Sequence, residues 1–233
     1  MPIDETFVII GAGQAGGCAA AALRADGFDG RVILLGEEPF VPYERPPLSK
    51  QVLAGAQSPE STFLRPAEFY HEQAIELRLG TRAVAIDHGA RRVGLSDGEP
   101  LEYDKLLLTT GSRVRRFSLP GAELSGIFYL RDIDDSLAIA SRLDGDAAVV
   151  VVGGGYIGLE VAATARRRGC RVTILEMQDV LMSRAVAPEI GQIFADIHTD
   201  HGVHVHTGVL TPMWGVARPI LRIKIAKWSR DKA

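Results

Sequence analysis

Two glycine-rich segments are the parts of this chain whose residue types and spacing could do chemistry. The pattern GxGxxG occurs twice, at Gly11, Gly13, Gly16 and at Gly153, Gly155, Gly158. In such a turn the first glycine bends the chain out of a strand, the second lets the backbone approach a pyrophosphate, and the third lets the next helix pack on the sheet. The helix N-terminus then faces the phosphates with free N–H groups and its positive dipole end. Each segment is therefore a candidate dinucleotide site.

An acidic residue follows each turn at the distance where dinucleotide-binding folds hold a ribose. Glu176 lies 23 residues after Gly153, at the end of an apolar strand, and Glu37 lies 26 residues after Gly11. A carboxylate at this place accepts hydrogen bonds from ribose hydroxyls. Gly36 holds the usual acidic position in the first segment, so that match is slightly irregular. No arginine stands beside Glu176 to receive a 2′-phosphate, which favours NAD over NADP.

The elements around the turns come in the same order twice. An apolar, β-branched run precedes each turn, a helix follows it, and a glycine leads into a second apolar strand. The expected strand, helix and strand are 7–10, 18–23 and 31–35 in the first unit, and 147–152, 159–168 and 171–176 in the second. One such pattern is weak evidence, but two make ordinary turns a poor explanation. The sequence predicts an α/β fold with two Rossmann-like dinucleotide-binding units.

Composition and charge are those of an ordinary globular chain. The 233 residues are 46% hydrophobic and 24% charged, with a formal net charge of −3, which excludes disordered and collagen-like classes. No apolar run reaches the ~18 residues of a membrane span, and residues 1–12 lack the basic start of a signal peptide. The basic run at 166–168 is typical of a solvated helix end. We expect a cytoplasmic protein that binds neither membranes nor nucleic acid.

Three further segments carry a family resemblance. Residues 41–50 read VPYERPPLSK, residues 106–112 read LLLTTGS, and residues 153–160 read GGGYIGLE. Together they resemble the FAD-dependent ferredoxin reductases, flavoproteins of the pyridine nucleotide-disulfide oxidoreductase superfamily that serve bacterial oxygenases. The resemblance covers residues 5 to about 208. It implies that the first unit binds FAD and the second binds NAD, and that the partner is a ferredoxin or a rubredoxin.

The resemblance also assigns roles to individual residues. For FAD it implies Glu37 at the ribose, Arg45 near the phosphates, Lys50 near the flavin ring, Val84 at the adenine through its backbone, Thr110 and Gly111 along the flavin, and Arg131 across the crossover. Without the family, the segment around Arg45 could be a stiff surface loop, because its two prolines fix the backbone, but the two glycine-rich turns beside it favour a role at the cofactor.

Lys50 and Glu160 are the two residues that the resemblance places at the reacting rings. A cation beside the flavin stabilises the negative charge of its reduced form, and a facing carboxylate orients both the lysine and the nicotinamide carboxamide. Hydride passes directly between the rings, so no nucleophile or general base is required. Without the family, Glu160 is an ordinary solvated helix residue.

Cysteines and histidines do not complete another site. Disulfide reductases with similar fingerprints need a CxxxxC pair, and this chain has only Cys18 and Cys170, which favours one-electron delivery to an iron–sulfur partner or reduction of a small oxidant. Four histidines stand at 198, 201, 204 and 206 without a carboxylate or cysteine to complete a metal set. Apolar residues at 190, 193, 194 and 197 predict a helix whose exposed end carries His198 and His201. We expect no metal.

The last residues differ from the rest of the chain. Residues 211–233 carry six basic side chains against one acid, together with both tryptophans. After Gly208 the sequence departs from the family pattern, which suggests a frameshifted or prematurely ended gene or, alternatively, a short basic docking extension. We expect an FAD-binding part at 1–118, an incomplete NAD-binding part at 119–210 and an atypical basic tail at 211–233. The alternating residues 220–225 are candidates for a substitute strand at the open sheet edge near Val205.

The expected function is electron transfer from NADH through FAD to a ferredoxin or rubredoxin of an oxygenase system. The alternative is an inactive truncated remnant with at most weak nucleotide binding. Contacts that the family makes to the ribityl chain of FAD have no counterpart in the sequence. We therefore expect bound flavin to be substoichiometric and turnover to be near background.

Overall fold

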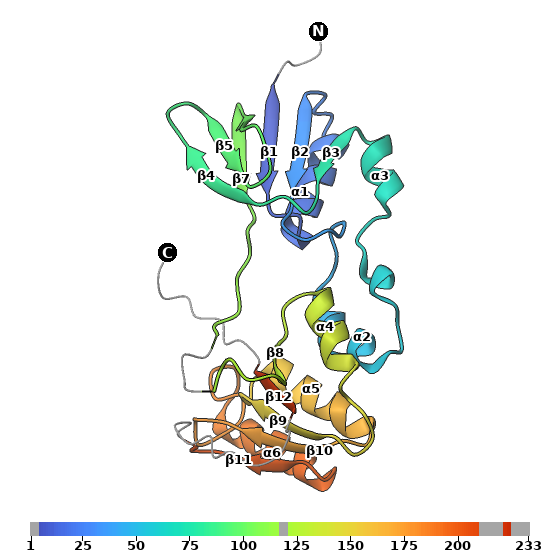
Figure 1. Cartoon of the computed structure of the whole chain (residues 1–233), viewed down its shortest axis with the longest axis vertical. Coiled ribbons are helices and arrows are strands. Elements are labelled where there is room, and N and C mark those ends of the chain that lie inside the picture. Colours follow the sequence, from blue (N-terminus) through green and yellow to red (C-terminus); the bar gives the residue numbers. More distant parts are fainter. Residues whose placement is uncertain (1–4, 117–120, 210–220, 225–233) are drawn as a thin grey trace. The chain divides into compact units, whose positions relative to one another are not determined.

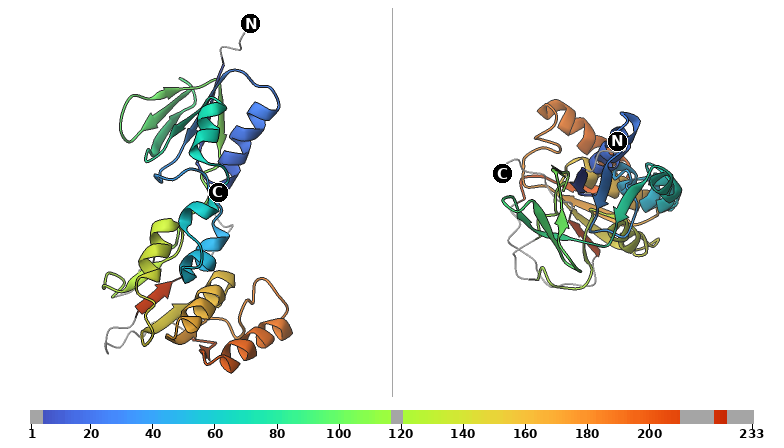
Figure 2. Two further views of the ribbon diagram at one scale, coloured as in Figure 1. Left: turned by 90° about the vertical axis from the view of Figure 1, so that its right-hand side faces the viewer. Right: turned by 90° about the horizontal axis from the view of Figure 1, so that it is seen from above.

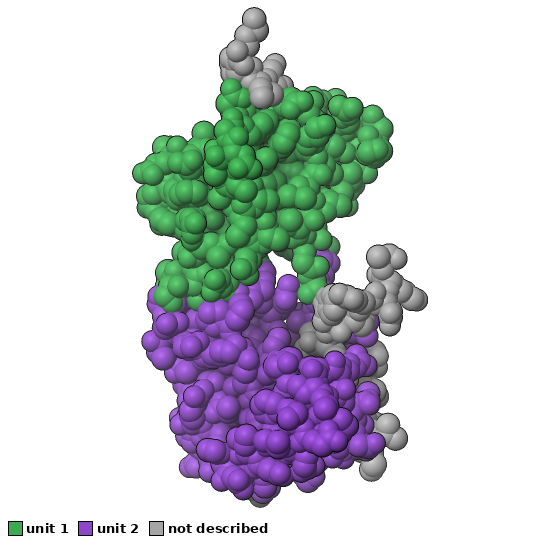
Figure 3. Space-filling view, turned by 180° about the vertical axis from the view of Figure 1, so that it is seen from behind, with its two compact units in different colours: residues 1–44, 60–112 green, residues 45–59, 113–233 purple. Residues whose placement is uncertain are grey.

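The computed structural model describes residues 5–116, 121–209 and 221–224 (Figure 1). The chain divides into two compact units (Figure 3). Unit 1 comprises residues 1–44 and 60–112, and unit 2 comprises residues 45–59 and 113–233. Each unit is built on a parallel sheet, which confirms the predicted α/β class. The segment 45–59 leaves unit 1 in the middle of its sequence and belongs to unit 2.

Unit 1 contains the first glycine-rich turn. Its elements are β1 (Thr6–Ile10), α1 (Gln14–Ala25), β2 (Arg31–Leu35), α3 (Ala67–Glu72), β3 (Ile75–Arg78), β4 (Ala83–Asp87), β5 (Arg92–Leu95), β6 (Leu101–Glu102) and β7 (Lys105–Leu108), with a short 3₁₀ turn η2 (Pro59–Thr62) at the start of its second segment. The parallel strands lie in the order β3-β2-β1-β7, and β4, β5 and β6 form a separate antiparallel sheet. The first βαβ unit is thus β1-α1-β2.

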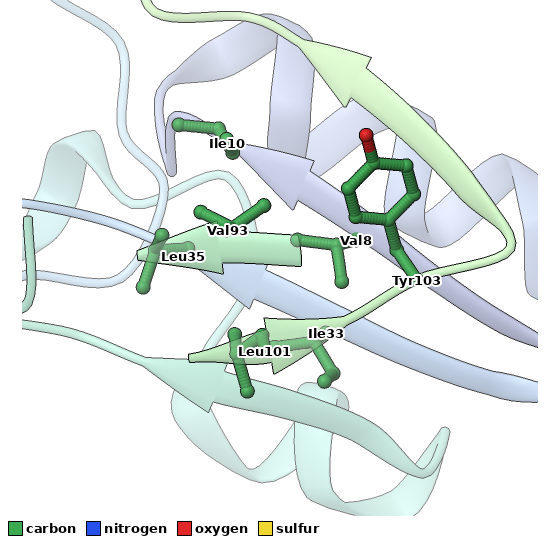
Figure 4. Close-up of a cluster of buried hydrophobic side chains, with 7 residues drawn as sticks. All are labelled: Val8, Ile10, Ile33, Leu35, Val93, Leu101 and Tyr103. Carbon is green, nitrogen blue, oxygen red and sulfur yellow. The ribbon is translucent and has the colours of Figure 1, made fainter. Parts of the chain in front are cut away.

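Alternate side chains of the parallel sheet in unit 1 enter two different cores, as the period of a strand requires. One face packs on the helices through Ile9, Val32 and Leu34, with Ala20 of α1 and Tyr70 of α3. The other face packs on the antiparallel sheet through Val8, Ile10, Ile33 and Leu35, which meet Val93, Leu101 and Tyr103 (Figure 4). Figure 2 shows the helices and the antiparallel sheet on opposite sides of the parallel strands. Covering both faces is what a parallel sheet needs.

Unit 2 contains the second glycine-rich turn. Its elements are η1 (Pro46–Ser49), α2 (Gln51–Ala54), β8 (Ile127–Tyr129), α4 (Ile133–Ala140), β9 (Ala148–Val152), α5 (Tyr156–Arg167), β10 (Arg171–Leu175), α6 (Pro188–Asp200), β11 (His204–His206) and β12 (Leu221–Lys224). All strands of its sheet are parallel, in the order β11-β10-β9-β12-β8. The second βαβ unit is β9-α5-β10.

The predicted tail strand exists, but its place in the sheet differs from the prediction. Leu221–Lys224 pairs with β9 on one side and β8 on the other, whereas β11 lies at one edge of the sheet. A strand between two others forms backbone hydrogen bonds on both of its sides, whereas a strand added at the edge beside β11 would form them on one side only. The prediction of a patch at the edge near Val205 is therefore wrong. Ile220 and Ile225 lie outside the described residues.

The segment 45–59 packs on two helices of unit 2. Its elements η1 and α2 contact both α4 and α5. Leu48 and Leu53 of this segment are almost fully buried, so the contact is a hydrophobic one with a stabilising effect of about 1.5–3 kcal/mol per side chain. The consequence for function is that Arg45 and Lys50 share a unit with the second turn.

None of the helices in the described ranges combines the length and the hydrophobicity that crossing a membrane requires.

Candidate functional site

The first turn has two glycines that the fold needs and one that leaves space. Gly11 has φ +115°, and a Cβ on it would lie 2.2 Å from the carbonyl oxygen of Thr109. A Cβ on Gly16 would lie 2.0 Å from the carbonyl oxygen of Gly11, because α1 packs directly on the turn. Gly13 has nothing within 4 Å of the place of a Cβ. The second glycine therefore leaves an open approach to the backbone, as a bound pyrophosphate requires.

The second turn repeats this geometry. Gly153 again has φ +115°, and its N–H donates to the Leu175 carbonyl at 2.8 Å. A Cβ on Gly158 would lie 2.0 Å from the Gly153 carbonyl oxygen, while Gly155 has open space around its Cα. Gly155 is also the N-cap of α5, so the free N–H groups of that helix begin at the open point. The two turns therefore leave the same open space at their second glycine and the same close helix packing at their third.

Glu176 is held rigidly against the second turn. Its side chain is only 6% exposed, and its two oxygens accept different backbone N–H groups, Oε2 from Gly154 at 2.7 Å and Oε1 from Gln178 at 2.9 Å. A buried carboxylate is stable only with such partners. The carboxylate thus has one fixed orientation beside the turn, and any ligand at the turn meets its negative charge.

The irregular acidic position of the first unit has a steric cause. A Cβ on Gly36 would lie 2.6 Å from the Cβ of Ala12, the second residue of the first turn. In the second unit the corresponding turn residue is Gly154, where a Cβ would lie 3.3 Å from the Cβ of Glu176. In each unit one of the two facing residues is a glycine, Gly36 in the first and Gly154 in the second, and a Cβ on it would crowd the residue opposite. The acid of the first unit moves to the next residue, Glu37, which is exposed and lies 3.7 Å from the guanidinium of Arg82.

Val84 lies at an irregularity of the antiparallel sheet in unit 1. The register between β4 and β5 shifts between Ala83 and Ala85, so Val84 has no cross-strand partner there. An extra residue of this kind keeps its backbone groups out of the ladder. The predicted backbone contact of Val84 to an adenine is compatible with this geometry, and its side chain is 60% exposed.

The segment after β7 closes on the first turn through a residue that the sequence analysis missed. Thr109 Oγ1 lies 2.9 Å from the Gly11 carbonyl oxygen and 3.1 Å from that of Ile10. The adjacent Thr110 and Gly111, which the resemblance assigns to the flavin, follow directly, and Gly111 has φ +66°. The two threonines look alike in the sequence, and nothing in the TTG motif distinguishes the one that fixes the turn.

Lys50 and Glu160 form an ion pair in unit 2. Lys50 Nζ lies 2.9 Å from Glu160 Oε2, and it also donates to the Pro46 carbonyl at 3.1 Å. Glu160 belongs to the second turn of α5, five residues after Gly155. The Ser49 hydroxyl donates to the same Oε2 at 2.6 Å, a contact that sequence reasoning did not foresee. The two residues that the resemblance places at the reacting rings are thus neighbours, beside the second glycine-rich turn.

Arg45 and Arg131 are also neighbours in unit 2. The Arg45 guanidinium donates to the Arg131 carbonyl at 2.6 Å. The N–H of Arg131 in turn donates to Asp135 Oδ2 at 2.8 Å, next to the capping box that Asp132 and Asp135 form at the start of α4. Burial and, to a lesser extent, the Asp132 charge raise the pKa of Asp135 above the ordinary value. The cap fixes the backbone of Arg131, and the carbonyl of that residue in turn holds the Arg45 guanidinium.

The residues assigned to FAD are divided between the two units. Glu37, Val84, Thr110, Gly111 and the first turn belong to unit 1, whereas Arg45, Lys50 and Arg131 belong to unit 2. All residues assigned to NAD, including Glu160 and Glu176, belong to unit 2.

The helix α6, which carries His198, packs with a different face from the one expected. Ile190, Ile193 and Ile197 of α6 are 43–50% exposed, and His198, expected at an exposed end, is buried. Gly191 explains the difference, since a Cβ there would lie 2.4 Å from the Leu181 carbonyl oxygen. The helix approaches the chain closely along the face of this glycine, and His198 is on the same face seven residues later. The described residues contain no group of three or more potential metal ligands.

The basic run at the end of α5 is not merely a solvated helix end. Arg166 donates to the His201 carbonyl at 2.8 Å, and Arg168 donates to the Leu53 carbonyl at 3.2 Å. These bonds fix the end of α6 and the segment 45–59, so the run has a structural role that the composition did not reveal.

Buried His198 predicts a loss of stability in mild acid. Burial, and secondarily the neighbouring His201, lower the pKa of His198 below its usual 6.5. The folded state therefore prefers the neutral His198 ring. The stability that comes from burying this neutral ring is fully present above about pH 6.5, the pKa of the unfolded chain, and is lost as the pH falls through the pKa of His198 in the folded state. We expect His198→Gln to flatten the pH dependence of urea unfolding in this window. His204→Gln, at an exposed position, is the control. If the free energy of unfolding depends on pH in the same way in both variants, the loss of stability in acid does not come from His198.

Comparisons with known proteins place this geometry in a family. The family described as pyridine nucleotide-disulphide oxidoreductase matches residues 5–211. Rhodocoxin reductase of Rhodococcus erythropolis is 46% identical over 208 residues, which cover 88% of this chain and 49% of the relative. The ferredoxin–NAD(+) reductase component of a biphenyl dioxygenase system from Paraburkholderia xenovorans is 46% identical over 187 residues, 80% of this chain and 46% of the relative.

A solved structure supports the same placement. The ferredoxin reductase for the CYP199A2 system from Rhodopseudomonas palustris aligns with a TM-score of 0.90 at 37% identity, over 95% of this chain and 58% of that one. The chain spans about half the length of the curated relatives that it matches. With two repeated turns and a family match over most of its residues, the chain belongs to the pyridine nucleotide-disulphide oxidoreductase family.

Proposed function

We propose that this chain carries the nucleotide-binding and hydride-transfer part of an FAD-containing, NADH-dependent ferredoxin reductase. The observation that carries the proposal is the Lys50–Glu160 ion pair at 2.9 Å beside the second glycine-rich turn. The names of similar proteins support it, because one relative is a ferredoxin–NAD(+) reductase component of a dioxygenase system. The proposed partner is a ferredoxin or a rubredoxin, and the proposed location is the cytoplasm.

The residues of each unit fit the dinucleotide assigned to it. In unit 1, the open space at Gly13 admits a pyrophosphate, and the exposed Glu37, which also lies 3.7 Å from the guanidinium of Arg82, has the carboxylate acceptors that ribose hydroxyls require. In unit 2, Gly155 leaves the same space at the start of α5, and Glu176 offers a fixed carboxylate. Anions are stabilised at both points by the N–H groups of the helix N-terminus.

The electrostatic roles of the proposed site follow from the ion pair. When bound, nicotinamide supplies a hydride and the flavin accepts it, to pass the electrons on singly to an iron–sulfur partner. Lys50 supplies a positive charge that favours negative charge developing nearby. Glu160 holds the lysine ammonium in one place, and the backbone of η1 provides the second acceptor, the Pro46 carbonyl. The chain itself needs no group that changes protonation during the reaction.

Reduction of bound flavin tests the function and the cofactor preference together. With FAD added in excess under anaerobic conditions, we expect NADH to bleach the bound flavin at least about tenfold faster than NADPH, because a 2′-phosphate would meet the fixed Glu176 carboxylate. A ferredoxin added afterwards is expected to become reduced. Glu176→Gln should reduce the difference between the rates with NADH and with NADPH, since the amide carries no charge. Bound flavin that NADH leaves oxidised would refute the function, and equal rates with both cofactors would refute the role of Glu176.

A further inference from the structure

The Ser49 hydroxyl is committed to Glu160. Ser49 is the last residue of η1 and is only 4% exposed. Its Oγ lies 2.6 Å from Glu160 Oε2 and 3.3 Å from the Pro46 carbonyl oxygen. A serine hydroxyl has a single proton to donate. The shorter contact to a charged acceptor is the stronger one, so the proton belongs to the carboxylate.

Two donors therefore converge on one oxygen of Glu160. Lys50 Nζ reaches the same Oε2 at 2.9 Å, and both donors come from consecutive residues of one segment. A single lysine on a flexible stem would leave the carboxylate free to rotate, because exposed ion pairs fix geometry only weakly. The buried serine adds a second, rigid direction. With both donors on Oε2, Oε1 is the oxygen that remains for a ligand.

The backbone of Ser49 is fixed by the same helix that carries Glu160. Thr164 Oγ1 donates to the Ser49 carbonyl at 3.3 Å, and Thr164 follows Glu160 by four residues, so both lie on one face of α5. One residue earlier, the buried Ser136 of α4 donates to the Leu48 carbonyl at 2.7 Å. Ser49 is thus held through its main chain and holds Glu160 through its side chain.

We propose that Ser49 is a positioning residue that fixes the orientation of the Glu160 carboxylate, and through it the Lys50 ammonium, for a ligand that presents an amide N–H. The carboxamide of nicotinamide is such a ligand, so the inference rests on the proposed function and extends it to a residue that the resemblance assigns to neither cofactor. The hydrogen bond makes Oε1 available in one direction instead of many. Loss of the bond should affect the nicotinamide end of a dinucleotide and leave the adenosine end unaffected.

The affinities of the full chain for NAD⁺ and for ADP-ribose, which lacks the nicotinamide, separate these two ends. We expect Ser49→Ala to weaken NAD⁺ binding about tenfold and to leave ADP-ribose binding unchanged, as loss of one hydrogen bond to a charged group predicts. Ser136→Ala is the matched control, because it removes another buried hydroxyl that holds the same segment without touching Glu160. It should leave the ratio of the two affinities unchanged. Ser49→Cys keeps a side chain of one heavy atom beyond Cβ but replaces the hydroxyl by a weaker donor, so its NAD⁺ affinity should fall between those of Ser49→Ala and the wild type.

A second measurement of the role of Ser49 needs no nucleotide. In the ligand-free chain, the NMR signal of the Lys50 ammonium should shift in Ser49→Ala and stay in place in Ser136→Ala. If Glu160→Gln lowers the ratio of the two affinities while Ser49→Ala and Ser49→Cys do not, Ser49 has no positioning role and the proposed function stands. If the wild type binds NAD⁺ no better than ADP-ribose and Glu160→Gln changes nothing, the nicotinamide site itself is refuted.

Discussion

Replacement of Gly158 by alanine is expected to destabilise unit 2 by about 3 kcal/mol, the upper part of the range for overpacked sites. The new Cβ would lie 2.0 Å from the carbonyl oxygen of Gly153, and this backbone atom belongs to the turn that links β9 to α5. Neither atom can move without displacing α5, whose Leu159, Val161 and Ala162 are buried. The melting temperature of the unit should fall by roughly 10 °C.

Gly155→Ala is the control for this prediction. A Cβ there has nothing within 4 Å, and the backbone at Gly155 has φ −87°, a value that alanine adopts without strain. The gain from a less flexible unfolded chain offsets part of the weaker N-cap, so the melting temperature should change little. Thermal unfolding by circular dichroism measures both variants, and hydrogen exchange of the amides in 147–176 assigns the loss to unit 2. Equal stability of the two variants would show that α5 does not depend on the third glycine.

The fold was predictable where the sequence repeats a pattern. The spacing of the two turns and the apolar runs around them gave both βαβ units, because period and glycine position are properties of the local sequence. The acid at Glu176 was equally visible. The shift from Gly36 to Glu37 was visible too, but its cause was not, since the contact with Ala12 joins residues distant in the sequence.

Features that depend on tertiary contacts were not predictable. The apolar spacing on α6 suggested an inward face of isoleucines, yet Gly191 sets the packed face by allowing a close approach to Leu181. The place of β12 between β9 and β8 depends on the pairing of strands far apart in the chain. Likewise, nothing local to 45–59 showed that this segment belongs to unit 2.

The sequence motifs predicted which residues form the site, but not how these residues contact one another. Lys50 and Glu160 are 110 positions apart and were brought together only by the resemblance, and the structure shows them as an ion pair. Ser49 and Thr109 went unnoticed because serine and threonine are common and their contacts are to residues distant in sequence. A polar residue next to a motif residue is the one signal that could have pointed to them.

Substitutions at the second glycine of each turn are expected to abolish one dinucleotide site at a time. Gly13→Ala and Gly155→Ala place a methyl group in the open space above their turns, where a pyrophosphate must come into contact with the backbone. If two charge-assisted hydrogen bonds are lost, affinity should fall about a hundredfold or more. Because a Cβ meets no atom of the protein at either position, folding should be largely preserved, which distinguishes this effect from that of Gly158→Ala.

The most direct test of the account is the equilibrium binding of FAD and of NADH to three proteins, the wild type, Gly13→Ala and Gly155→Ala, in one series. The account predicts that the wild type binds both dinucleotides, that Gly13→Ala loses FAD and keeps NADH, and that Gly155→Ala loses NADH and keeps FAD. Loss of both ligands in both variants, or unchanged binding in either, would contradict the assignment of one dinucleotide to each turn.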